Sequence, residues 1–112
     1  MSIYVVNLGI EQGTDFQQTF DLTATNGQPL NLENYSGKSQ MRKYAGSRNA
    51  YDFTVTFTDR ASGQIKLSIT DTITKRIKPG RYIYDIQLTD SNDEKLRVCE
   101  GQVLVRESAT KG

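Results

Sequence analysis

The chain has 112 residues and a mass of 12.6 kDa, which is the size of one ordinary domain. Its 14 Lys and Arg residues balance 13 Asp and Glu residues, and a net charge of +1 gives no electrostatic footprint for a nucleic acid or a membrane. The absence of histidine and the single cysteine, Cys99, exclude histidine-dependent triads, imidazole metal ligands, four-cysteine zinc sites and an internal disulfide. We therefore expect no enzyme, no cofactor and no metal site.

Apolar and polar residues alternate along most of the chain. Phe53, Val55 and Phe57, for example, are separated by threonines, which suit an exposed pleated surface. Because successive side chains of a strand point to opposite faces, each such run offers one apolar and one polar face. We expect strands at residues 3–8, 15–23, 38–44, 51–59, 64–70, 81–89 and 95–106.

Turn residues separate these runs. Asn26-Gly27 is a typical hairpin turn, and the other turns are predicted at residues 61–63, at Pro79-Gly80 and at residues 90–93. Turns that recur about every 8–12 residues are typical of an antiparallel sandwich or barrel. The first fold-level prediction is therefore two packed layers of sheet.

Two segments depart from simple alternation. Residues 71–77 predict a single helical turn, with Asp71 as its N-cap and with Ile73 and Ile77 on one face. In the last strand the apolar residues have even numbers before residue 99 and odd numbers after residue 101. A bulge or sharp bend at Cys99-Glu100-Gly101 would restore inward pointing on both sides, and the alternative is two strands that meet at Gly101.

These elements predict an all-β fold, an immunoglobulin-like antiparallel β-sandwich of about seven strands with one short helical turn. The sandwich domain is expected over residues 1–107 and a flexible C-terminal tail over residues 108–112. The two cysteines and the tryptophan of true immunoglobulin domains are absent, so the prediction concerns the architecture alone. We expect neither a signal peptide nor a membrane helix.

Motifs for phosphate or calcium binding are incomplete. Gly37-Lys38-Ser39 resembles the end of a P-loop, but Leu32 stands where the first glycine is required. Acidic residues gather at 90–94 without the spacing and the glycine of a calcium loop. The carboxylates of Asp15, Asp21, Asp85 and Glu100 could form pairs, but no cleft is indicated. We interpret these segments as turns and exposed strand faces.

The most distinctive loop spans residues 42–51. It carries three cations and two tyrosines around small residues, and Tyr and Arg are enriched at protein interfaces. One interpretation is a solvated hairpin loop, and others are a protein contact or a stacking surface for a sugar or single-stranded nucleic acid. We assign partner binding to Arg42, Lys43, Tyr44, Arg48 and Tyr51.

Some strands are apolar on both faces. Ile83 lies on the otherwise polar face of its strand, Val5 and Val6 are adjacent, and residues 103–105 are all apolar. Strands of this kind are either central in a structure or covered by a partner. We therefore hypothesise that another subunit covers part of one sheet.

Strand-and-turn motifs from Ile10 to Val105 resemble those of small tail-region structural proteins of bacteriophages and prophages. They are similar to the N-terminal immunoglobulin-like domain of phage upper-baseplate proteins. The motifs are Ile10-Glu11-Gln12-Gly13-Thr14-Asp15-Phe16, Phe20-Asp21-Leu22-Thr23, Asn26-Gly27-Gln28-Pro29-Leu30-Asn31-Leu32 and residues 35–43, 80–89 and 96–103.

The resemblance implies a building block of the virion with no catalytic residues. The expected partners are other virion proteins and copies of the chain itself, with no nucleic acid, membrane or small-molecule substrate. The expected function is docking by protein–protein contacts in the tail or baseplate, and the location is the virion, assembled in the bacterial cytoplasm. Two alternatives remain open: capsid decoration, and a carbohydrate-binding module that recognises the host surface through exposed tyrosines. The candidates are Tyr44, Tyr51, Tyr82 and Tyr84, of which Tyr82 and Tyr84 alternate in step with Ile86 and are expected in the core.

Overall fold

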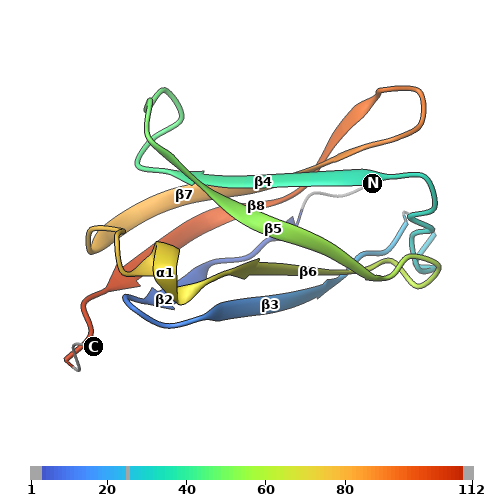
Figure 1. The fold of residues 1–112 in the computed structure, drawn as a ribbon. Coiled ribbons are helices and arrows are strands. Elements are labelled where there is room, and N and C mark those ends of the chain that lie inside the picture. The colour runs from blue at the N-terminus through green and yellow to red at the C-terminus, as the bar shows by residue number, and fades with distance from the viewer. Residues whose placement is uncertain (1–3, 25, 110–112) are drawn as a thin grey trace.

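The computed structural model describes residues 4–24 and 26–109, and within them the fold is all-β, as predicted. Eight strands and one helical turn follow one another along these residues (Figure 1). Their bounds are β1 Tyr4–Val5, β2 Leu8–Glu11, β3 Phe16–Asp21, β4 Ser36–Arg42, β5 Ala50–Asp59, β6 Gln64–Ile69, α1 Asp71–Thr74, β7 Gly80–Thr89 and β8 Lys95–Arg106.

The strands form two layers that share β5. We call the layer β1/β2–β8–β7–β4–β5 sheet A and the layer β5–β6–β3 sheet B. Residues 50–53 of β5 pair with β4, whereas residues 54–59 pair with β6, so the chain passes from one sheet to the other within one strand. The orders β4–β7–β8 and β5–β6–β3 correspond to the two sheets of an immunoglobulin-like sandwich.

The first predicted strand is wrong in two respects. It is divided into β1 and β2, and both pair with β8 in parallel rather than antiparallel. The division falls at Val6 and Asn7, where the Asn7 Oδ1 atom accepts a hydrogen bond from the Gln102 amide at 3.0 Å. A side chain thus replaces the backbone acceptor of the ladder at this point. Residue 3, which the prediction included, lies outside the described residues.

The helical turn is shorter than predicted. α1 ends at Thr74, and its N-cap is Thr70 rather than Asp71. Ile73 is 36% exposed and Ile77 is fully buried, because the helix has ended before Ile77 and the two side chains do not share a face. The Thr74 hydroxyl donates to the Thr14 carbonyl at 2.8 Å, which fixes α1 to the β2–β3 turn.

A bulge interrupts β8 just before the predicted position. Ile86 pairs with Cys99 and Gln87 pairs with Arg97, so Val98 is the extra residue. Val98 and Cys99 are both fully buried, and β8 continues as one strand rather than two. The change of inward-pointing residues that the sequence indicated is therefore real, and the bulge produces it.

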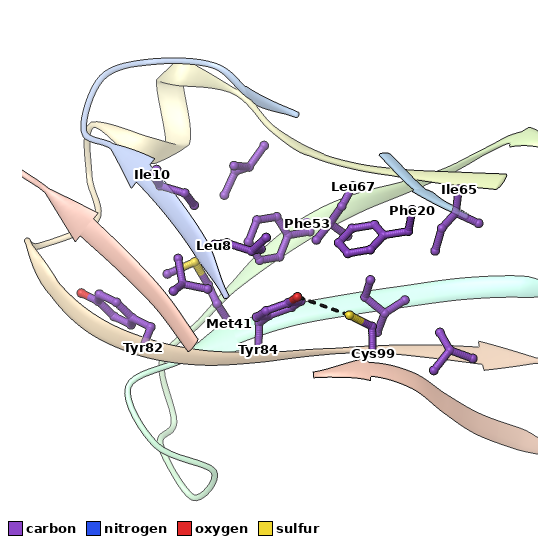
Figure 2. Packing of buried hydrophobic residues seen from close by; sticks show 14 of the residues in the cluster. Leu8, Ile10, Phe20, Met41, Phe53, Ile65, Leu67, Tyr82, Tyr84 and Cys99 are labelled. Atoms are coloured by element: carbon purple, nitrogen blue, oxygen red, sulfur yellow. Dashed lines mark hydrogen bonds between the residues drawn. The ribbon is translucent and has the colours of Figure 1, made fainter. Parts of the chain in front are cut away.

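The core lies between the inner faces of the two sheets (Figure 2). Phe53 joins the layers, because its ring centroid lies 6.1 Å from those of both Phe16 and Tyr84. The Tyr84 hydroxyl lies 3.3 Å from the Cys99 sulfur and donates to the Val6 carbonyl at 2.6 Å. A buried tyrosine needs such a partner, and here the partner ties β7 to the β1–β2 break.

Candidate docking surface

Two hairpins rise from sheet A on the side away from sheet B (Figure 1). We call residues 42–49, at the β4–β5 connection, the basic arm, because they contain Arg42, Lys43 and Arg48 and no acidic residue. We call residues 90–94, at the β7–β8 connection, the acidic arm, because they contain Asp90, Asp93 and Glu94 and no basic residue. The outward-pointing side of sheet A between the arms is called face A below.

Face A is hollowed by an open groove of about 610 Å³. Outward side chains of β4, β7 and β8 line it, together with Ala45 of the basic arm. Among them are the cations Lys38, Arg42 and Arg97 and the carboxylates of Asp85 and Glu100. The groove is therefore polar and carries both signs of charge, with Ile83 as an apolar side chain in its lining.

A network of surface hydrogen bonds and ion pairs orders this lining. The Arg97 Nε atom lies 3.4 Å from the Asp85 Oδ2 atom, and its Nη1 atom lies 3.9 Å from the Glu100 Oε1 atom. Arg42 donates to the Gln40 side chain at 3.0 Å, which in turn donates to Asp52 at 2.7 Å. Exposed pairs of this kind contribute little to stability, at most about 1 kcal/mol each, but they hold side chains in place.

The five residues assigned to partner binding do not converge on one site. Arg42 points into the groove, where it also donates to the Ser47 carbonyl. Lys43 places its ammonium 5.0 Å from the Tyr82 ring centroid, and Tyr51 packs edge-on against the same ring at 6.4 Å. Tyr44, which is 64% exposed, and the exposed Arg48 remain available to a partner.

The four tyrosines considered for sugar stacking do not form an exposed row. Tyr44 is exposed and Tyr51 is half-buried, whereas Tyr82 and Tyr84 are buried in the core. Burial raises the pKa of Tyr82 and of Tyr84 above the ordinary value. A stacking platform needs several open aromatic faces, and among the four tyrosines only Tyr44 is fully exposed.

Large apolar side chains are exposed on strands of sheet A. Val5 is 73% exposed, Leu104 45% and Ile83 40%. The outward side chains of sheet B are hydroxyls, amides and Lys66 and Asp21; within the described part of the chain no large apolar residue is exposed there. The sequence indicated this feature through apolar residues at polar positions of the alternation, but it held no sign of the groove.

The described residues show neither a metal-binding cluster nor an exposed thiol. No group of three or more Cys, Asp and Glu side chains among them is arranged to hold a metal ion. Cys99 is fully buried, and burial raises the pKa of its thiol. Within the same residues, no helix is long and apolar enough to cross a membrane.

No protein-family model and no curated protein matches the sequence. Solved structures do match the fold. The N-terminal domain of ORF48 of phage TP901-1 superposes with a TM-score of 0.56 at 13% identity, over 95% of this chain and 99% of that domain. A mutant of the SrpA adhesin of Streptococcus sanguinis has a TM-score of 0.53 at 12% identity, over 96% of this chain and 56% of that one. At such identities, the likeness concerns the fold alone.

Proposed function

We propose that the chain is a structural subunit of a bacteriophage virion that docks by protein–protein contacts in the tail or baseplate. The observation that carries this proposal is the match to a domain of a phage protein over nearly the whole of both chains. The motifs that resemble phage tail-region proteins point the same way, although no family model supports them.

Face A and its neighbouring strands β1 and β8 are the proposed docking surface. Val5, Ile83 and Leu104 expose apolar side chains on sheet A, and burying that area against a partner would be favourable. The groove adds a concave shape and a charged lining. Apolar contact area with a polar rim is the usual composition of a protein interface. The partners are other virion proteins or copies of the chain, and catalysis has no part in the function.

A second candidate is recognition of host glycans; the likeness to an adhesin favours a role in adhesion in general and names no sugar. The arrangement of the tyrosines disfavours it, since only Tyr44 of the four is open to a sugar ring. Binding to a glycan array that is lost in Tyr44→Ala would support this candidate instead. Capsid decoration uses the same kind of docking and differs from the main proposal only in the position on the particle.

The test is the composition of the particle. Phages induced from the bacterium that carries this gene are purified, and the chain is sought by mass spectrometry and located with a specific antibody in electron microscopy. We expect it in intact particles, with label on the tail. Label on the head would favour decoration, and absence from purified particles would overturn the proposal.

A further inference from the structure

We propose that the basic arm of one copy of this chain binds the acidic arm of a second copy, so that the protein pairs with itself across face A. This inference names a partner for the surface proposed above and rests on that proposal. It is carried by two oppositely charged hairpins that stand on the same side of one sheet (Figure 1).

The arms cannot neutralise each other within one molecule. Arg42, at the base of the basic arm, pairs with Ile83, whereas the acidic arm begins after Thr89 at the other end of β7. Six residues of strand separate these points, which is roughly 20 Å at about 3.3 Å per residue. This exceeds the Debye length of about 8 Å at physiological ionic strength, so the charges of one arm are screened from the other.

The charges of both arms are also left without ionic partners. The ion pairs among the described residues involve Arg97 and Arg106 as cations, and none involves Arg42, Lys43 or Arg48. Likewise, none involves Asp90, Asp93 or Glu94. The Asp90 carboxylate is engaged by the amides of Asn92 and Glu94, both at 2.9 Å, so Asp93 and Glu94 are the carboxylates available to a partner.

The placement of the arms favours a second copy over an unrelated partner. Because both arms rise from the same face, two copies arranged end to opposite end bring each basic arm against an acidic arm. A contact of this kind is isologous, since residues of one arm meet the complementary arm twice in the same assembly. Arg48 and Tyr44, two exposed side chains of the basic arm, would meet Asp93 and Glu94.

Charge reversal tests the pairing on the full chain. Sedimentation in low salt should show a concentration-dependent dimer that dissociates as salt is raised. Lys43→Glu with Arg48→Glu should weaken dimerisation at least about tenfold, because two exposed attractions become repulsions in each contact. Asp93→Lys with Glu94→Lys should do the same. Lys75→Glu with Arg76→Glu is the matched control: it changes the net charge equally at exposed residues after α1 and should leave the dimer intact.

Mixing the two reversed variants is the decisive step of the experiment. One variant then carries two acidic arms and the other two basic arms, so a heterodimer should form although neither variant dimerises alone. Since Lys43 contacts Tyr82, Arg48→Glu alone serves as a second variant in case the double change perturbs folding. A chain that stays monomeric in low salt at about 1 mM, or reversed variants that fail to pair, would overturn the inference.

Failure of this inference is distinguishable from failure of the proposed function. A monomer that is nevertheless found in purified particles leaves the virion assignment in place and removes the arm-to-arm contact. A charge-dependent dimer that is absent from particles would keep the arm-to-arm contact and remove the virion assignment.

Discussion

The outer faces of the two sheets differ, although their inner faces are alike. Each sheet contributes a continuous row of aliphatic and aromatic side chains to the core, as Leu67 does from sheet B and Ile86 from sheet A. On the outside, sheet B presents threonines of β5, such as Thr56, whereas face A presents Ile83, a groove and two charged arms.

This difference separates what maintains the fold from what serves a partner. A threonine-rich pleated surface is stable in contact with water and needs no partner, because β-branched residues suit the strand and the hydroxyls are solvated. Face A, by contrast, exposes apolar side chains, and their contact with water does not stabilise the fold. Face A is therefore the surface for which we propose binding, and substitutions on the two sheets can sharpen or break this contrast.

The largest effects should come from the shared inner layer. Leu67→Ala in sheet B and Ile86→Ala in sheet A each remove a fully buried side chain, so each should lower the free energy of unfolding by about 2–5 kcal/mol. Urea denaturation measures both. Thr56→Ala, on the exposed side of β5, is the control and should change stability by less than about 0.5 kcal/mol. A mild effect at only one of the buried positions would show that the two sheets do not share one core.

Within sheet A, two segments of backbone approach each other closely where β8 passes the β1–β2 break. A Cβ atom at Gly101 of β8 would collide with the Val6 carbonyl group at the β1–β2 break, whereas a Cβ atom at Gly9 of β2 would meet nothing within 4 Å. Gly101→Ala should therefore cost about 1–3 kcal/mol through overpacking. Gly9→Ala should be neutral or slightly stabilising, because alanine restricts the unfolded chain. Equal melting curves for the two variants would contradict this close crossing of β8 and the β1–β2 break.

The sequence predicted the layers well because alternation with period two follows directly from strand geometry. It placed the bulge slightly late, since a change in the inward-pointing positions reveals that an extra residue exists but not that Val98 is the one. It missed the break at Asn7 because a side chain that substitutes for a backbone acceptor leaves no periodic trace. These errors concern single contacts between distant segments.

The candidate site was predictable in part for a similar reason. Exposure of Tyr44 and Arg48 follows from their position in a loop rich in small residues. The inward turn of Lys43 and Tyr51 toward Tyr82 depends on how the β4–β5 hairpin packs on β7, which local sequence does not specify. The groove depends on how β4, β7 and β8 lie side by side and on the direction in which the basic arm leaves the sheet, and both are properties of the whole fold.

The buried thiol of Cys99 should make the free energy of unfolding depend on pH. Burial raises the pKa of Cys99, so the unfolded chain releases the thiol proton at a lower pH than the folded chain does. The folded state then binds more protons above the ordinary thiol pKa of about 8.5, and stability should fall as pH rises from there. Unfolding in urea at pH 7 and at about pH 9.5 measures this loss, which one proton limits to about 1.4 kcal/mol per pH unit. In Cys99→Ala, the loss over this interval should become smaller; an unchanged loss would mean that another group causes it.

Ile83→Thr should change stability only slightly, and it bears most directly on the difference between the outer faces. Ile83 is 40% exposed and pairs across the sheet with Arg42 and Gln102, so threonine keeps a β-branched residue in the strand and shortens a partly exposed apolar side chain. Urea unfolding should change by less than about 0.5 kcal/mol. Assembly with the partner of face A should nevertheless weaken, because threonine leaves less apolar area for a partner to cover. Thr56→Ile is the converse change on sheet B and should leave assembly unaltered, since exposed apolar area there lies outside the proposed surface. If Thr56→Ile altered assembly and Ile83→Thr did not, the assignment of binding to face A would be wrong.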